Sequence, residues 1–230
     1  MRPKHKISVL IVNYNEKEIT ARCIDSIYKS IFKNIEIIVV DNGSKDDTVK
    51  IAADYADKVH NLGYPNCSKA KNEGAKLAKG NYLAFLDADL KIKEDLIEKS
   101  YNKILEGNVA AICPVKTING NLIGDRIFDL INNVILLGFI VKIPRGYLML
   151  EKKNFESMHD KHNVFREDLK LGEDLHCGGI LKKYGKIGIV DSINFTDARR
   201  QKDQGYVNMA WQWLKTYINY ATGLKLKIDY

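Results

Sequence analysis

Two aspartates one residue apart, Asp87 and Asp89, directly follow the apolar run at residues 82–86. The run is short and begins just after Gly80, which is typical of a buried strand rather than a helix. Two carboxylates at the end of a buried strand are costly unless something pairs with them. Because carboxylate oxygens suit Mg²⁺ or Mn²⁺, we expect them to bind a divalent cation that carries a phosphate. The alternative is that both acids only end the strand and cap the next helix.

Two earlier strands are expected to end in polar residues in the same way. Residues 7–12 and 35–40 are nearly continuous apolar segments, and polar side chains follow each of them. Apolar side chains between these segments recur at helical spacing, which predicts a βαβ unit with parallel strands. Open α/β sheets bind ligands at the carboxyl ends of their strands. We therefore expect the polar residues of the three strand ends to share one crevice: Asn13, Tyr14, Asp41, Asp87 and Asp89.

The rest of the pattern favours a single α/β domain over residues 1–230. Further strands are expected at residues 58–61, 109–113, 147–151 and 187–191. Further helices are expected at residues 47–55, 65–77, 93–105 and 204–222, the third with Glu94 and Asp95 in its first turn. Residues 117–124 are rich in Gly and Asn, which is typical of a loop.

Six motifs resemble, in their order along the chain, the signature of family 2 glycosyltransferases. They are VLIVNYNE at 9–16, IVVDNGSKDDT at 38–48, NLG at 61–63, AKNEGA at 70–75, LDAD at 86–89 and GED at 172–174. The resemblance covers roughly residues 6–185 and implies the GT-A fold, a Rossmann-like, mostly parallel sheet flanked by helices. It also implies a nucleotide-diphosphate sugar donor, a divalent metal and usually inversion at the anomeric carbon.

In such a protein the first half of the chain, about residues 6–115, would hold the nucleotide-sugar. The second half, about residues 116–230, would shape the acceptor side and include the C-terminal helix. The acceptor is then expected to be a hydroxyl group of a glycan or of a lipid-linked glycan.

The resemblance implies that Asp41 hydrogen-bonds the nucleotide base, while Asn13, Tyr14 and Glu16 line the same crevice. A carboxylate can accept a hydrogen bond from the imino N–H of uracil or guanine. The alternative is that Asp41 caps a turn with Gly43.

The resemblance also implies a metal and diphosphate site. Asp89 would reach the metal, and Asp87 would contact it, its bound water or the ribose. Lys71 stands where the family often has arginine, and a cation there can reach the diphosphate. Its alternative is a solvent-facing helical lysine.

A second acidic pair, Glu173 and Asp174, resembles the element that carries the catalytic base. Asp174 would deprotonate the acceptor hydroxyl, with Glu173 as a further contact; the alternative is that both acids only open a helix. The sequence departs from the family pattern at His176 and Ile180, and glycines at 178 and 179 are unusual in a helix. Arg199 and Arg200 resemble a basic element that closes over the diphosphate, or they form a surface patch.

Composition excludes several other classes of protein. The net charge of +7 comes mostly from lysine, without an Arg-rich cluster or a nucleic-acid signature, so no nucleic-acid partner is expected. The first strand is not followed by the Gly-rich turn of a dehydrogenase. The four cysteines lack paired spacing, and we find no signal peptide or membrane-spanning run, so a cytoplasmic protein is expected. Two alternatives stay open: a polyprenyl-phosphate sugar synthase and a non-catalytic nucleotide-binding module.

The C-terminal helix has two apolar faces. One face is expected to pack on the domain: Val207, Trp211, Leu214 and Ile218. A second face, with Lys215 beside it, carries mostly aromatic side chains: Met209, Trp213, Tyr217 and Tyr220. Aromatic side chains flanked by lysines suit a peripheral contact with the cytoplasmic face of a membrane. The alternatives are a homodimer interface and an ordinary core.

Overall fold

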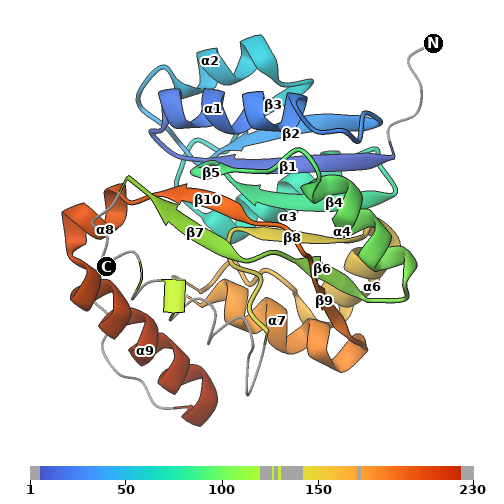
Figure 1. The fold of residues 1–230 in the computed structure, drawn as a ribbon, viewed down its shortest axis with the longest axis vertical. Helices are drawn as coiled ribbons and strands as arrows, with labels where there is room; N and C mark the ends of the chain where they lie inside the picture. The colour runs from blue at the N-terminus through green and yellow to red at the C-terminus, as the bar shows by residue number, and fades with distance from the viewer. Residues whose placement is uncertain (1–5, 120–125, 127–128, 131–141, 170–171, 224–230) are drawn as a thin grey trace.

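The computed structural model describes residues 6–119, 126, 129–130, 142–169 and 172–223. Within these ranges, seven strands form one sheet in the order β3-β2-β1-β4-β8-β6-β9 (Figure 1). Their bounds are Ile7–Asn13 (β1), Ile35–Asp41 (β2), Lys58–Asn61 (β3), Tyr82–Asp87 (β4), Ala110–Ile112 (β6), Tyr147–Glu151 (β8) and Ile187–Ile189 (β9).

Strand directions place a topological switch at β1. Strand β1 pairs in parallel with β2 on one side and with β4 on the other, and β2 pairs in parallel with β3. Strand β8 runs antiparallel to both of its neighbours, β4 and β6. The chain leaves β1 toward β2 but returns to β4 on the opposite side, and this is where open α/β sheets bind ligands.

Helices cover both faces of the sheet (Figure 1). One apolar core lies between the sheet and α1 (Lys17–Tyr28), α2 (Thr48–Tyr55) and α4 (Leu96–Leu105). The other lies between the sheet and α3 (Cys67–Leu77), α6 (Lys152–His162) and α7 (Glu173–Tyr184). Alternate residues of β1 explain the two cores, since Val9 and Ile11 belong to the first and Leu10 to the second.

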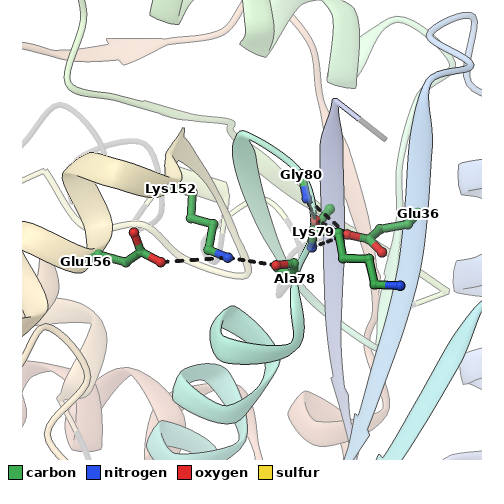
Figure 2. A network of polar contacts seen from close by, with 7 residues as sticks. Glu36, Ala78, Lys79, Gly80, Lys152 and Glu156 are labelled. Atoms are coloured by element: carbon green, nitrogen blue, oxygen red, sulfur yellow. Dashed lines mark hydrogen bonds and ion pairs between the residues drawn. The ribbon is translucent and has the colours of Figure 1, made fainter. Parts of the chain in front are cut away.

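A polar network closes the sheet at the amino ends of β1, β2 and β4. The Glu36 carboxylate, buried in β2, accepts hydrogen bonds from the Ser8 hydroxyl and from the backbone N–H groups of Lys79 and Gly80. Beside it, Lys152 Nζ donates to the carbonyl oxygen of Ala78 at 2.7 Å (Figure 2). Gly80 has no room for a side chain, because a Cβ there would lie 2.7 Å from the backbone nitrogen of Ser8.

A second, three-stranded sheet lies beside the end of β4. It consists of β5 (Leu90–Lys91), β10 (Asn194–Asp197) and β7 (Val115–Ile118), with β10 in the centre. None of these strands is predicted by the sequence pattern, and β7 occupies the start of the segment expected to be a loop. These three strands mix apolar with polar or charged side chains over two to four residues, so no apolar run marks them in the sequence.

The predicted long elements are confirmed, with corrections at their ends. Helix α4 begins at Leu96 rather than at residue 93, so that Asp95 is its N-cap instead of lying in its first turn. The C-terminal helix expected at residues 204–222 is confirmed as α9 (Tyr206–Thr222), and a short helix that is not predicted, α8 (Arg199–Gln204), precedes it. They separate at Gly205, whose φ of +80° favours glycine. Helix α6 follows β8 without a break and is not predicted.

Candidate functional site

The predicted binding residues meet at the carboxyl ends of three neighbouring strands. In the sheet register, Asn13 of β1 lies opposite Asp41 of β2, and Val12 lies opposite Asp87 of β4. Adjacent strands are about 4.8 Å apart, so these positions lie along one short edge. The structure therefore brings Asn13, Asp41 and Asp87 together, as the strand pattern predicts.

Asp41 caps a turn with one carboxylate oxygen, and its other oxygen has no hydrogen-bond partner within the part of the chain that the structure describes. Its Oδ2 accepts hydrogen bonds from the backbone N–H groups of Gly43, at 3.1 Å, and Ser44, at 2.8 Å. Its Oδ1 is buried and has no hydrogen-bond partner among the described residues, and the same is true of both amide atoms of Asn13. Buried polar atoms are nearly always satisfied, so these three are candidates for bonds to a ligand.

The loops after β1 and β2 are tied to each other. The Asn15 N–H donates to Ser44 Oγ and the Glu16 N–H to Thr48 Oγ1. Gly43 has a φ of +84°, and a Cβ there would lie 2.8 Å from the backbone nitrogen of Tyr64. The side chain of Tyr14 is exposed on this edge, where a stacking surface for a base is expected.

The acidic pair lies between β4 and the small sheet. The Asp87 N–H donates to the carbonyl oxygen of Gly146 at 2.9 Å, and Asp89 Oδ2 accepts a hydrogen bond from Thr196 Oγ1 at 3.3 Å. Within the described residues, no cluster of three His, Cys, Asp or Glu side chains has the arrangement of a metal site. A cation held here would have Asp87 and Asp89 as protein ligands and would need further oxygens from a substrate.

The second acidic pair opens α7 and contacts a buried lysine. Helix α7 begins at Glu173 and Asp174, after Gly172, whose φ is +85°. Lys71 Nζ, on α3, lies 3.0 Å from Asp174 Oδ1 and 3.6 Å from Glu173 Oε1, and only 7% of its side chain is exposed. Lys71 is therefore an ion-pair partner of the predicted base in this structure, not the solvent-facing lysine of the alternative.

Burial and charge shift the ionisation of these groups. Burial lowers the pKa of Lys71, but Asp174 and its other anionic neighbours outweigh it, so the pKa lies well above the usual value. Burial, followed by the negative charge of Asp174, raises the pKa of Glu173. The ammonium group of Lys71 thus stays charged beside the acids of α7.

A small pocket joins the two acidic pairs. Its lining includes Asp87 at the end of β4, Asp174 on α7, Lys71 and the aromatic ring of Phe165. Lys71 Nζ lies 5.1 Å from the centre of that ring. Groups expected to hold the donor and the acceptor therefore share one cavity.

Arg145 is a further charged residue of this region, and it is not among the predicted site residues. It lies between Pro144 and Gly146, which both line the pocket, and its guanidinium stacks on Trp213 at 3.8 Å from the ring centre. Burial lowers its pKa to about 10, opposed by the charges of Asp174 and Asp87. The only sequence signal is a cation directly before a predicted strand.

Comparison with known proteins agrees with the resemblance. Residues 8–165, more than half of the chain, match the family model of glycosyl transferase family 2. The chain belongs to this family. The match of this family 2 glycosyltransferase ends before Glu173 and Asp174, so it does not bear on the roles predicted for these two acids.

Curated relatives are larger than the chain. It is similar to glycosyltransferase GlyA of Streptococcus pneumoniae serotype 4, with 37% identity over 106 residues, which are 44% of this chain and 15% of that protein. It is similar to the uncharacterized glycosyltransferase YibD of Escherichia coli K12, with 33% identity over 114 residues, which are 47% of this chain and 33% of that protein. The chain thus spans well under half the length of both.

Solved structures show the same fold. Residues 1–349 of Staphylococcus aureus TarS, crystallised in complex with UDP-GlcNAc, superpose with a TM-score of 0.64 and 22% identity. The likeness covers 84% of this chain and 58% of that chain. Like these neighbours, the family 2 glycosyltransferase has the GT-A fold.

The basic element after β10 also reaches the crevice. Arg199 Nη2 donates to the Glu16 carboxylate, so it connects α8 to the loop that follows β1. The side chain of Arg200 lies outside the described part of the structure. Arg199 therefore lies beside the loop after β1, the predicted nucleotide side, and is paired with Glu16.

The face of α9 that is expected to pack on the domain is largely exposed. Val207 is 84% exposed and Trp211 54% exposed, and Leu214 is exposed as well, whereas Met209 is buried. The face that carries Met209 and Trp213 turns toward the domain because Trp213 stacks on Arg145. Among the helices that the structure describes, none is both long and apolar enough to cross a bilayer.

Proposed function

We propose that this family 2 glycosyltransferase moves a sugar from a nucleotide-diphosphate sugar to a hydroxyl group of a glycan or lipid-linked glycan, with inversion. The observation that carries the proposal is the pocket in which Asp87 of β4 and Asp174 of α7 meet. The TarS structure that resembles this chain holds UDP-GlcNAc, so uridine nucleotides are the first donors to test.

Mg²⁺ or Mn²⁺ fits the residues at the end of β4. Asp87 and Asp89 supply only hard oxygen atoms, and Mg²⁺ commonly binds through one or two carboxylates plus substrate phosphates. When bound, the cation would neutralise negative charge on the diphosphate leaving group.

Residues of the chain would divide the remaining work. The unpartnered Oδ1 of Asp41 would accept a hydrogen bond from the nucleotide base, beside the amide of Asn13 and the ring of Tyr14. Asp174 would take the proton of the acceptor hydroxyl as its oxygen bonds to the anomeric carbon. The bond from that carbon to the phosphate oxygen would break, and its electron pair would leave with the nucleoside diphosphate.

Thermal shift with nucleoside diphosphates, with and without Mn²⁺, tests the donor assignment. The correct nucleotide should raise the melting temperature most, and only with Mn²⁺, because tight binding stabilises the folded state by mass action. If no nucleotide shifts the melting temperature in a metal-dependent way, the proposal is wrong.

The base is tested by Asp174→Asn in a transfer assay with a hydroxyl acceptor. Loss of a general base should lower kcat by about 10²- to 10⁴-fold and leave nucleotide affinity nearly unchanged. A wild-type rate would instead favour a polyprenyl-phosphate acceptor, whose oxygen is already ionised. Nucleotide binding without any transfer would favour the non-catalytic module.

We also propose a peripheral contact between the outer face of α9 and an anionic membrane. The exposed side chains Val207, Trp211 and Leu214 lie on this face, Lys215 lies 5.8 Å from the Trp211 ring, and α9 contains no acidic residue. Such a face suits an anionic bilayer surface. Sedimentation with anionic vesicles should be lost in Val207→Ser/Trp211→Ser and at high salt, whereas a concentration-dependent dimer would identify a homodimer interface instead.

A further inference from the structure

Besides the predicted diphosphate cations Lys71 and Arg199, the site region contains Arg145. Lys71 contacts Asp174 and Glu173, and Arg199 donates to Glu16. Arg145 lies on a different segment, next to the carboxylates at the end of β4. We infer that Arg145 binds a phosphate of the donor and that Trp213 of α9 positions it. This inference rests on the proposed function.

The backbone around Arg145 places it beside the acidic pair. The carbonyl oxygen of the next residue, Gly146, accepts the hydrogen bond of the Asp87 N–H. Gly146 has a φ of +67°, and a Cβ there would lie 3.6 Å from Asp87 Oδ2. The charge of Arg145 acts on both Asp174 and Asp87. Pro144 and Gly146, on either side of Arg145, line the same pocket as the predicted base Asp174 and the predicted metal ligand Asp87, so this segment lies beside both acids.

Stacking on Trp213 suits the guanidinium for phosphate binding. The ring centre lies 3.8 Å from Cζ of Arg145, so the aromatic ring covers one face of the planar group. The N–H donors of a guanidinium lie in its plane and point outward from its edge. A covered face therefore fixes the plane without using donors, and two parallel N–H groups match two phosphate oxygens.

The same helix also contacts the element that carries the predicted base. A Cβ on Gly172, one residue before Glu173, would lie 3.2 Å from Cγ2 of Thr216. A Cβ on Gly179 of α7 would lie 1.9 Å from the hydroxyl oxygen of Tyr220, so this glycine makes room for the tyrosine. Three residues of one face of α9 thus contact Arg145 and α7, and the glycine that is unusual in a helix has a packing role.

Calorimetric titration with Mn²⁺-pyrophosphate and with Mn²⁺-UDP tests the inference. Pyrophosphate presents the anion without base or sugar, so it reports on Arg145 independently of the donor identity. Arg145→Met should weaken both probes by about 10-fold or more, because a charge-assisted bidentate contact is lost. Arg145→Lys should recover only part of the loss, since lysine lacks the planar fork.

The positioning role of Trp213 is tested with one aliphatic and one aromatic variant. Trp213→Leu should weaken both probes about 5-fold, and Trp213→Phe by less than about 2-fold, because only phenylalanine keeps an aromatic face for the cation. The matched control is Trp211→Leu, two residues away on the exposed face, which should leave the affinity for both probes in solution unchanged. Melting temperatures of all variants separate a loss of folding from a loss of binding.

Fluorescence gives a readout that a purely structural role would not move. The chain has two tryptophans, so Trp211→Phe leaves Trp213 as the single fluorophore. Mn²⁺-pyrophosphate should change its emission, and the change should disappear in the additional Arg145→Met background. A Trp213→Leu protein with a lower melting temperature but wild-type affinity for both probes would reject the positioning role.

The outcomes separate this inference from the proposed function. Wild-type affinity for both probes in Arg145→Met, or no binding of either probe by the wild type, overturns the inference. If Arg145→Met transfers sugar with an unchanged donor KM, the inference fails and the proposed function stands. If Arg145-dependent pyrophosphate binding is found without turnover of any nucleotide-sugar, the anion site stands and the proposed transfer activity fails.

Discussion

The two edges of the large sheet use buried polar side chains in opposite ways. At the amino edge, the Glu36 carboxylate receives three hydrogen bonds from its own chain (Figure 2). At the carboxyl edge, Oδ1 of Asp41 and the amide of Asn13 have no partner among the described residues. An acid that is satisfied within the chain stabilises the fold, whereas one that keeps a free oxygen costs stability unless a ligand binds.

The largest effect of a mutation is expected at the carboxyl edge, where activity should fall while stability is unchanged. Asp89→Ala should lower turnover by at least about 10³-fold and remove the metal dependence of nucleotide binding, because a predicted metal ligand is lost. The melting temperature should stay close to that of the wild type. The control is Asp54→Ala, an exposed acid on α2, and wild-type turnover by Asp89→Ala would reject the metal assignment.

At the amino edge, the large effect should be on stability alone. Glu36→Ala removes the acceptor of the Ser8 hydroxyl and of the Lys79 N–H, while the Gly80 N–H can still donate to Ser8 Oγ at 2.8 Å, so the free energy of unfolding should fall by about 2 kcal/mol or more. Urea denaturation measures it, with Glu156→Ala as control, since that change removes only the 3.7 Å ion pair with Lys152 (Figure 2). If the rate of sugar transfer per folded molecule also falls, the amino edge contributes to activity and the proposed division between the two edges is wrong.

Asp41→Asn tests an acid that accepts hydrogen bonds from its own chain with one oxygen and is proposed to bind the nucleotide with the other. Its remaining carbonyl oxygen can still accept from Gly43 and Ser44, so the turn should survive. The free oxygen, however, is replaced by an N–H₂ donor, which should weaken nucleotide binding by about 10-fold. Calorimetric titration measures the change, and an unchanged affinity would leave Asp41 with the turn role only.

The smallest effect is expected for Lys152→Met. The change removes the 2.7 Å hydrogen bond to the Ala78 carbonyl but keeps the apolar stem, so the free energy of unfolding should fall by about 1 kcal/mol. Nucleotide affinity and turnover should not change. A measurable loss of activity would show that the amino edge influences the pocket, and would contradict the view that this edge serves stability alone.

The sequence predicts the strand ends well because their signal is local. Apolar runs that stop at Asn13, Asp41 and Asp87 identify both the sheet and its ligand-binding edge, and the register confirms that they are adjacent. The long helices follow from apolar periodicity in the same way.

The features that the sequence does not predict depend on contacts between residues that are far apart along the chain. Both faces of α9 are apolar, so periodicity finds the helix but cannot decide which face packs; the contact of Trp213 with Arg145 decides it. Lys71 is recognisable as a cation of the site, but its pairing with Asp174 depends on how α3 and α7 approach each other. The short strands β5 and β10, which place Thr196 against Asp89, are too brief to show a pattern.

The direction of β8 has a consequence for how this scaffold can diversify. Because β8 runs antiparallel to β4, its first residue, Tyr147, lies opposite Leu86, next to the acidic pair. The chain therefore arrives at the pocket as it enters β8, whereas the parallel strands reach it as they leave the sheet. Replacing residues 144–146 by a segment from another protein would exchange pocket chemistry while the pairing from Leu86 to Tyr82 holds the frame. The entry to β8 is thus a natural point for grafting a new substrate preference onto an unchanged sheet.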